Sequence, residues 1–348
     1  MFRSLGPLFH KERGKEEDLA EQAGTVIRRL GDHALNAPRR PKRDVDGWLI
    51  LDKPVGMTST HAVSIAKRAF QAKKAGHAGT LDPLASGVLP IALGEATKTV
   101  PMVMDGRKAY RFTVRWGVET DTDDAEGRAV ATSNVRPDPE AVKALLPRFT
   151  GEILQVPPRF SAIKIDGERA YDLAREGEEV VLEARPVVID TLELVSVPDR
   201  DHAEFEATCG KGTYVRALAR DTGRALGTFG HVVALRRTAV GPFRADTAVP
   251  IDPLQALFEA EPEARLAAIR TLVQPVMSAL TQLICVAVSS NDAARLHRGQ
   301  PVLLRGRDAP VMEGLVYVTA GGNLVALADV EQGELVPKRV FKLAGARA

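Results

Sequence analysis

Apolar positions recur along the chain with the two-residue period of strands in some stretches and with the helical period in others. An apolar run at residues 48–51 (WLIL) predicts a buried strand, which the turn-forming DKPVG ends. A helix capped by Ser59 or Thr60 is expected over residues 61–70, and a second helix, entered at a proline, over residues 138–149. Because strands and helices mix without a βαβα rhythm, the pattern predicts an α+β fold around an antiparallel or mixed sheet.

Shifts in composition divide the chain into several segments. Residues 1–44 are polar and charged, which predicts a flexible N-terminal extension, and the strand and helix patterns of the main domain fill residues 45–243. Within that domain, residues 157–185 combine a proline-rich entry with a charged amphipathic helix, so they are expected to form an excursion from the core. Residues 244–284 read as a helical linker, and the short strands and turns of residues 285–345 predict a small β-rich domain.

The composition excludes several protein classes. No apolar run reaches the roughly 18–20 residues that a membrane span needs, so no membrane segment is expected. Two cysteines far apart, Cys209 and Cys285, form neither a disulfide framework nor a metal-ligand spacing, which favours a reducing cytoplasm. The net charge of +2 says little about partners, so any nucleic-acid binding has to depend on local basic clusters.

Several motifs of cofactor and metal sites fail on spacing. The stretch DTDDAEG at residues 121–127 has an alanine at the fifth position of a calcium loop and its glycine one place late, so an acidic surface turn is predicted. The stretch GKGTYV lacks the third glycine of a dinucleotide fingerprint, and the seven histidines show no metal-ligand spacing. We therefore expect neither a cofactor nor a metal.

One carboxylate, Asp82, stands in the small and apolar run GHAGTLDPLASGVLPIALGEATK. An Asp-Pro pair commonly starts a turn, and local chemistry alone favours that interpretation. The alternative is a catalytic carboxylate, which would need a fixed cation to stay ionised in a site that excludes water. Arg216 in CGKGTYVR could supply that cation, and Tyr214 would share its face if both ended a strand.

Two of the four tyrosines lie beside basic residues, which is the combination that splayed nucleotides require. Tyr110 stands in GRKAYRF and Tyr214 in CGKGTYVR. An aromatic plane can stack on a base while neighbouring cations contact phosphates. Taken singly, each tyrosine is more simply a core residue, but together they favour a nucleic acid as the ligand.

Beyond these local arguments, the chain resembles the TruB family of bacterial tRNA pseudouridine synthases. The motifs GWLILDKPVGMTST, GHAGTLDPLASGVLPIALGEATK, KAYRFTVRWGVETDTDDAEG, PPRFSAIKIDGERAYDLAREG, CGKGTYVRALARDTG and HVVALRRTAVGPF occur in family order, with no departure at a motif position. The resemblance is dense from Gly47 to Phe243, and residues 291–343 resemble a PUA-type RNA-binding domain. It implies a pseudouridine synthase catalytic domain that isomerises uridine in the T-loop of tRNA (position 55) without cofactor or metal.

The resemblance also implies roles for individual residues. Asp82 would be the catalytic aspartate, acting by attack on C1′, by addition to C6 or by removal of the C2′ proton, and the target base would have to flip out of its stack. Residues 157–185 would form a flexible thumb over the RNA. Arg216 matches the arginine that pairs with the aspartate, and Tyr110 matches the tyrosine that stacks on the base and serves in removal of the C5 proton. Tyr214 and Leu235 match residues that line the pocket, and His77 matches the residue that fills the space of the flipped base. Lys53 and Lys98 match two lysines that are structural or phosphate-facing.

Two other functional classes compete with a standalone synthase. An RNA-folding chaperone would need the pocket for docking only, but Asp82, Tyr110 and Arg216 are all present, and binding alone would not require a carboxylate facing an anionic backbone. A catalytic subunit of a guide-RNA complex is disfavoured by the thumb-like segment, which implies direct contact with the tRNA T-arm. We therefore expect an enzyme that acts without guide RNA, and a monomer is the default expectation. Cys209 is expected to be a small buried residue and not a nucleophile.

Overall fold

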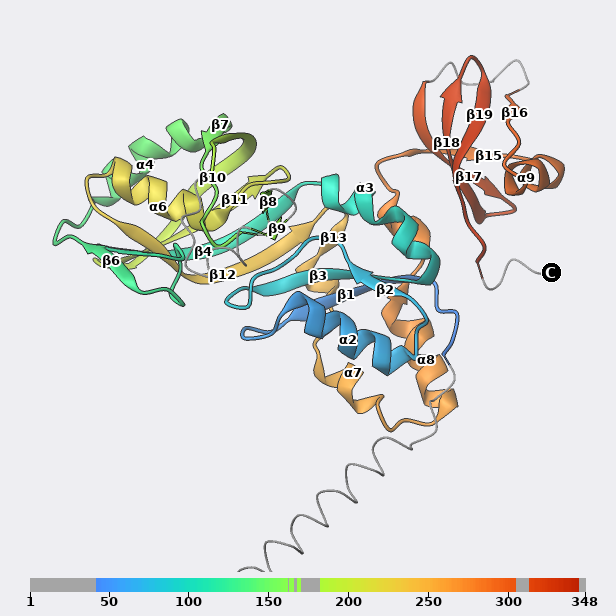
Figure 1. Cartoon of the computed structure of the whole chain (residues 1–348), viewed down its shortest axis with the longest axis horizontal. Coiled ribbons are helices and arrows are strands. Elements are labelled where there is room, and N and C mark those ends of the chain that lie inside the picture. Colours follow the sequence, from blue (N-terminus) through green and yellow to red (C-terminus); the bar gives the residue numbers. More distant parts are fainter. Residues whose placement is uncertain (1–41, 162, 166–167, 170–181, 305–312, 344–348) are drawn as a thin grey trace, which may run out of the picture. The chain divides into compact units, whose positions relative to one another are not determined.

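The computed structural model describes residues 42–161, 163–165, 168–169, 182–304 and 313–343 (Figure 1). The chain from Arg43 onward groups into one unit. The expected N-terminal extension lies almost wholly outside the described residues. So does much of the thumb-like segment at residues 157–185. None of the helices in the described ranges has the length and apolar character that a membrane crossing demands.

A ten-stranded sheet forms the body of the unit. Its order is β14-β1-β3-β12-β4-β11-β10-β7, with β2 added on β3 and β13 on β12. All neighbours are antiparallel except β3 and β12, which run parallel, so the predicted mixed sheet is confirmed. The strands are β1 (Gly47–Lys53), β2 (Ala75–His77), β3 (Ser86–Leu93), β4 (Lys108–Trp116), β7 (Gly151–Gln155), β10 (Arg185–Asp199), β11 (His202–Cys209), β12 (Gly230–Val240), β13 (Phe243–Arg244) and β14 (Val273–Gln274).

The parallel contact between β3 and β12 requires a glycine. Gly87 pairs with Arg237, and its φ of 104° lies in the region that side chains rarely adopt. A Cβ added to Gly87 would lie 2.2 Å from the Arg237 carbonyl oxygen, so any other residue would push the strands apart. This close approach brings the segment before β3 next to the middle of β12.

Helix α2 (Ser59–Phe70) buries an apolar stripe in the core beside this sheet. Ala62, Ile65, Ala66 and Ala69 recur at helical spacing and are all buried. The N-cap is Thr58, whose hydroxyl accepts a hydrogen bond from the amide of His61, so the sequence prediction of Ser59 or Thr60 as the cap was wrong by one or two positions. Ser59 instead bonds outside its own helix, as described below.

The other helices and short strands surround this framework. The proline-entered helix is confirmed as α4 (Pro139–Leu145), which continues as the 3₁₀ turn η2 (Leu146–Phe149). The remaining elements are α3 (Val100–Asp105), α6 (Val215–Ala225), α7 (Asp252–Ala256), α8 (Pro262–Leu272), η1 (Gly94–Thr99), η3 (Ala245–Thr247), η4 (Val276–Ala279), β5 (Val118–Thr120), β6 (Ala129–Thr132), β8 (Lys164–Ile165) and β9 (Glu168–Arg169).

Residues 244–284, expected to form a helical linker, contribute to the main core. Leu254 of α7 is fully buried in the cluster that contains the apolar face of α2. The guanidinium group of Arg265 in α8 donates to the carbonyl of Ala69 near the end of α2 (2.8 Å) and to that of Leu257 (2.7 Å). Helices α7 and α8 therefore brace α2 rather than merely connecting two regions.

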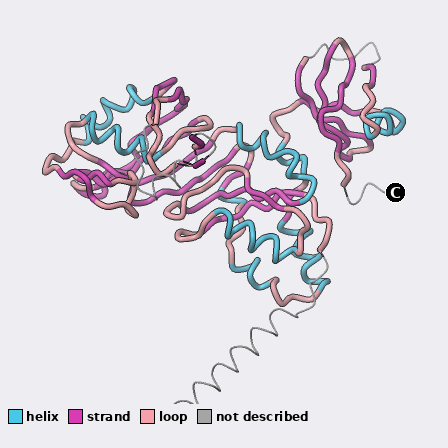
Figure 2. The backbone as a smooth tube through the Cα atoms, viewed as in Figure 1, coloured by secondary structure: helices cyan, strands magenta, loops and turns pink. Residues whose placement is uncertain are grey.

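The C-terminal part forms a second, five-stranded sheet with the order β15-β17-β18-β19-β16, and Figure 2 shows its predominance of strands. The predicted β-rich C-terminal region is confirmed. Its core includes Leu296, Val318 and Leu335. The elements are β15 (Ile284–Ala287), α9 (Ser290–His297), β16 (Val302–Leu303), β17 (Gly314–Ala320), β18 (Asn323–Glu331) and β19 (Glu334–Val340).

Candidate active site

The loop between β2 and β3 carries Asp82 and is fixed from several sides. The Ser59 hydroxyl accepts a hydrogen bond from the Leu81 amide (2.9 Å) and lies 3.0 Å from the Leu81 carbonyl, to which it can donate. The amide of Gly56 donates to the Pro83 carbonyl (2.8 Å), and that of Ala85 closes a turn onto the Asp82 carbonyl (3.1 Å). The small and apolar residues around Asp82 therefore allow a tight backbone, which presents one carboxylate with 38% of its side chain exposed.

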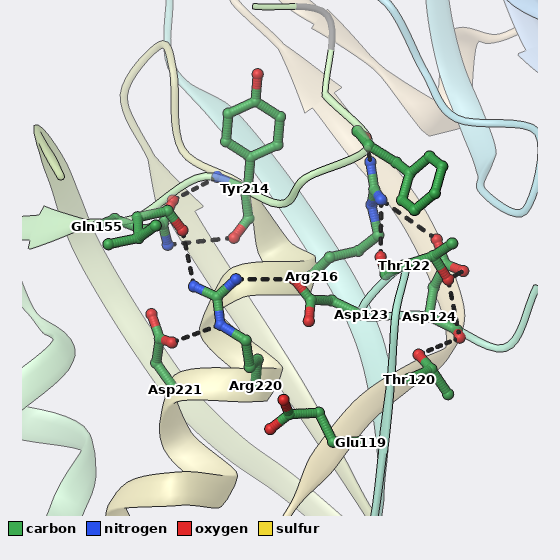
Figure 3. Close-up of polar contacts among 12 residues, drawn as sticks. Glu119, Thr120, Thr122, Asp123, Asp124, Gln155, Tyr214, Arg216, Arg220 and Asp221 are labelled. Carbon is green, nitrogen blue, oxygen red and sulfur yellow. Dashed lines mark hydrogen bonds and ion pairs between the residues drawn. The ribbon is translucent and has the colours of Figure 1, made fainter. Parts of the chain in front are cut away.

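Arg216 at the start of α6 supplies the expected fixed cation. Its Nη2 atom lies 3.0 Å from Asp82 Oδ2 and 2.9 Å from the Phe160 carbonyl oxygen, to which it donates. Its Nη1 donates to the Thr122 carbonyl (2.9 Å) and lies 3.5 Å from Asp124 Oδ2 (Figure 3). With only 6% of its side chain exposed and four oxygen partners, Arg216 can hold the Asp82 carboxylate in one orientation.

Arg216 is the first of three arginines spaced four residues apart on α6. Because residues four apart share a helix face, the three side chains reach the same neighbouring segment, residues 119–124. Arg220 and Asp123 are both buried and pair at 2.9 Å. The three pairs are Arg216 with Asp124, Arg220 with Asp123, and Arg224 with Glu119.

This pairing contradicts the sequence prediction of an acidic surface turn at residues 121–127. Asp123 and Asp124 are both buried, because the α6 arginines neutralise them. Burial nonetheless raises the pKa of Asp123 from 3.8 to about 6, although the positive charges of Arg220 and Arg216 act to lower it. The turn therefore has an inner part, Asp123 and Asp124, that pairs with the α6 arginines, and an exposed part at Ala125 and Glu126.

The two tyrosines reach Asp82 from different elements. Tyr110 lies in β4 and Tyr214 directly precedes α6, where the Gln155 side chain bonds both its amide (2.9 Å) and its carbonyl (3.2 Å). Burial raises the pKa of each phenol, and the negative charge of Asp82 contributes in the same direction. The expected strand end at Tyr214–Arg216 was wrong, because β11 stops at Cys209 and Arg216 belongs to a helix.

Leu235 and His77 are the less polar candidates. Leu235 is buried in β12, opposite Phe112 of β4, in the core cluster that also contains Leu81 and against which Tyr110 packs. In the register of β12 with β4, the Leu235–Phe112 pair lies two residues from the pair that contains Tyr110. His77 ends β2 opposite Ile91, five residues before Asp82 in sequence.

The two lysines have structural contacts. Lys53 is fully buried and donates to the carbonyls of Met57 (2.8 Å) and Pro54 (2.9 Å), and burial lowers its pKa to about 8. Lys98 pairs with Glu95 (2.6 Å) and donates to the Val340 carbonyl (2.8 Å). Of the two interpretations open for these residues, the geometry favours the structural one.

Three residues with evident roles were not singled out from the sequence as parts of the site: Ser59, Asp124 and Arg237. The sequence predicts a helix cap at Ser59 and a surface residue at Asp124, and it assigns no role to Arg237, which lies within one of the family motifs. Arg237 is buried and bonds the backbone just before Asp82. A buried arginine in a strand is the signal that could have identified it, but burial of a charged residue is not visible in a sequence pattern.

The remaining questions from the sequence are whether Cys209 could act as a nucleophile and whether side chains gather as metal ligands. Cys209 is buried, and burial raises the pKa of its thiol to about 11, which agrees with the expected small buried residue and not with a nucleophile. Within the described ranges, no three His, Cys, Asp or Glu side chains gather as metal ligands would.

Comparison with known families identifies the class of protein that carries this site. Residues 67–215 match the model of the TruB family pseudouridylate synthase (N terminal domain), and residues 216–281 match that of the tRNA pseudouridylate synthase B C-terminal domain. The two matches meet between Tyr214 and Arg216 and include Asp82, Tyr110 and Leu235. They assign the chain to the pseudouridylate synthases.

Whole-chain relatives narrow this assignment. The proteins named tRNA pseudouridine synthase B of Bradyrhizobium diazoefficiens and Nitrobacter winogradskyi are each 65% identical to the chain. The match with the first covers 90% of this chain and 90% of the relative. The match with the second covers 91% of this chain and 88% of the relative. The chain therefore belongs to the TruB family of pseudouridylate synthases.

Solved structures share the fold. The archaeal box H/ACA sRNP Nop10-Cbf5 complex contains a chain with 26% identity and a TM-score of 0.66, covering 86% of this chain and 87% of that one. A chain of a Cbf5-Nop10-Gar1 complex has the same identity and TM-score, and the match covers 88% of this chain and 91% of that one. The predicted fold class, an α+β synthase domain with a β-rich C-terminal part, is confirmed.

Proposed function

We propose that this protein converts uridine to pseudouridine in tRNA, at position 55 of the T-loop, with Asp82 as the catalytic carboxylate. The observation that carries the proposal is the 3.0 Å pair between Asp82, partly exposed on a rigid loop, and the buried Arg216. It stands in a chain 65% identical to proteins named tRNA pseudouridine synthase B. A carboxylate that a buried cation orients where a ribose can reach it suits a reaction at C1′.

The reaction is an isomerisation, so its atoms balance without a redox partner. The C1′–N1 bond breaks, the uracil turns, a C1′–C5 bond forms, C5 loses a proton and N1 gains one. Asp82 acts by attack on C1′, by addition to C6 or by removal of the C2′ proton. We propose that Tyr110, which lies in β4, stacks on the base and serves in removing the C5 proton.

A uridine in the T-loop must leave its stack to reach Asp82. Flipping costs a few kcal/mol, which contacts to the flipped base and the surrounding backbone must offset. We assign Tyr214 and Leu235 to lining the base site and His77 to the space that the base vacates. Lys53 supports the Asp82 loop, since its ammonium group lies 3.5 Å from the Pro83 carbonyl oxygen.

Further roles follow from the same proposal. The domain boundaries at residues 45–243, 244–284 and 285–345 stay predictions, as does a PUA-like RNA-binding role for the last of these. We propose direct recognition of the tRNA T-arm by a monomer without guide RNA, in the cytoplasm.

The proposal is tested by mapping the modified nucleotide. Purified protein is incubated with an unmodified tRNA transcript and no other RNA, and pseudouridine is located by carbodiimide labelling and primer extension. We expect one stop, at position 55, and none in a matched transcript with cytidine there. Tight binding of the transcript without any modification would instead favour an RNA-folding chaperone.

A further inference from the structure

Arg237 is a buried cation next to the candidate active site to which no role has yet been given. It lies in β12 with 2% of its surface exposed. Its Nε donates to the Val88 carbonyl (2.8 Å), Nη1 to the Thr80 carbonyl (3.1 Å) and Nη2 to the Gly79 carbonyl (3.2 Å). One guanidinium group therefore ties both ends of the loop that carries Asp82.

The same side chain meets Tyr110. In the antiparallel pairing of β12 with β4, Arg237 and Tyr110 are direct partners, so their side chains lie on the same face of the sheet. This register brings the guanidinium group close to the phenol of Tyr110, where its positive charge offsets part of the effect of burial on the pKa of the phenol. Asp82 and Cys209 are the other titratable groups that act on this phenol, and both oppose its ionisation.

Burial of a guanidinium group is expensive unless a carboxylate compensates for it. Among the ion pairs of the described residues, none joins Arg237 to a carboxylate, whereas its neighbour Arg236 forms two bonds to Asp52, at 2.8 and 3.0 Å. The partners of Arg237 are three carbonyls, the Tyr110 phenol and the field of Asp82. A charge in this position does more than fill space, because an apolar side chain would pack there at lower cost.

We propose that Arg237 is a positioning residue for the isomerisation, which fixes the Asp82 loop and the Tyr110 phenol relative to one another through a single guanidinium group. This inference rests on the proposed function of the site. The planar fork sets two directions at once, toward the loop carbonyls and toward the phenol, which a lysine cannot do. Its charge also favours the loss of the phenol proton that removal of the C5 proton requires. Arg237 touches neither the base nor the ribose in this account.

The first test compares equivalent substitutions at adjacent positions. Arg237→Lys keeps the charge but not the fork, and Arg237→Gln removes the charge. Arg236→Lys is the matched control, since it lies one residue away on the opposite face of β12 and pairs with Asp52. We expect single-turnover release of tritium from C5-labelled tRNA at saturating enzyme to fall about 100-fold in both Arg237 variants, as small misplacements of reacting groups can cost that much.

Binding and tyrosine titration separate positioning from general support. The Kd for tRNA should stay within about threefold, since the catalytic geometry and not the RNA contact is altered. With ¹³Cζ-labelled tyrosine, the Tyr110 resonance, assigned by its loss in Tyr110→Phe, should shift in Arg237→Gln and titrate at higher pH than in the wild type. An arginine that only supports the fold would leave that resonance unchanged as long as the variant is folded.

The possible outcomes are distinct. An unchanged turnover rate in Arg237→Lys and Arg237→Gln, or an unmoved Tyr110 resonance, overturns the inference. If neither Arg237 variant folds, the guanidinium ¹⁵N signals of the wild type and of Tyr110→Phe decide it, because loss of the hydroxyl must shift a buried arginine signal if the two groups are in contact. A wild-type protein that releases no tritium would refute the proposed function instead, whatever the tyrosine spectra show.

Discussion

Replacement of Arg216 by methionine tests the role of the cation that orients Asp82. Methionine has a similar length but no donor, so the substitution removes the pair with Asp82, the contact with Asp124 and the hydrogen bonds to two carbonyls, those of Thr122 and Phe160. Asp82 can turn to water, since more than a third of its side chain is exposed. Asp124 is buried, and its remaining hydrogen bonds within the described residues come from neutral donors, the Thr122 hydroxyl and the Glu126 amide.

The magnitude follows from this difference between the two carboxylates. Loss of the partner of a buried charge costs about 3–5 kcal/mol, whereas the partly solvated pair with Asp82 adds little. We therefore expect the free energy of unfolding to fall by about 3–5 kcal/mol, nearly all of it from Asp124 and the stranded carbonyls. Turnover should fall by about 10²–10³-fold or more, because the preorganised partner of the catalytic carboxylate is gone.

Urea unfolding and single-turnover kinetics below the unfolding transition measure the two effects separately. Arg224→Met is the matched control, since it removes a bidentate arginine–carboxylate pair with Glu119 from the same helix, two turns farther on. It should lower stability by about 1–3 kcal/mol and leave the rate unchanged. Arg216→Met with wild-type turnover would refute the reasoning, and so would an Arg224→Met rate loss of the same size.

Two further substitutions test other parts of the account. The folded-state pKa of Asp123, about 6, lies above its ordinary 3.8, so its contribution to stability is fully present below about pH 4 and is lost as pH rises through 6. Asp123→Asn removes this titration, and the free energy of unfolding of the variant relative to the wild type should rise by about 3 kcal/mol between pH 4 and 7 in urea titrations; a constant difference would contradict the assignment. Lys53→Met should lower stability and turnover but leave the salt dependence of tRNA binding unaltered, because a buried ammonium group cannot contact a phosphate. A slope smaller by about 1 would restore the phosphate-facing interpretation.

The sequence predicted the parts of this site that depend on motifs and local patterns. The mixed sheet and the β-rich C-terminal part follow from periodicity, whereas Arg216 was one cation that could serve Asp82. Local chemistry alone favours a turn at Asp82, and the catalytic role and the pairing with Arg216 are what the resemblance to a known family implies. The structure adds how the loop that carries Asp82 is fixed. The Ser59 hydroxyl accepts a hydrogen bond from the Leu81 amide, and Arg237 donates one to the Thr80 carbonyl.

The errors concern residues whose environment is set by distant parts of the chain. Asp123 and Asp124 look solvated because their partners lie about ninety residues away, on α6. A strand end at Tyr214–Arg216 was considered, yet β11 stops at Cys209 and, after a turn at residues 210–214, α6 begins at Val215. Lys53 is an ordinary charged residue in the sequence, and only the carbonyls that converge on it explain its burial.

Release of tritium from tRNA labelled at uridine C5 tests the central claim most directly. Wild-type protein and Asp82→Asn, which keeps the size of the side chain but not its charge, are compared without added metal or guide RNA, and tRNA affinity is measured for both. The account predicts one equivalent of tritium from the wild type, none from Asp82→Asn, and affinities within a few-fold. Full release by the variant, or no release by the wild type despite tight binding, would contradict it.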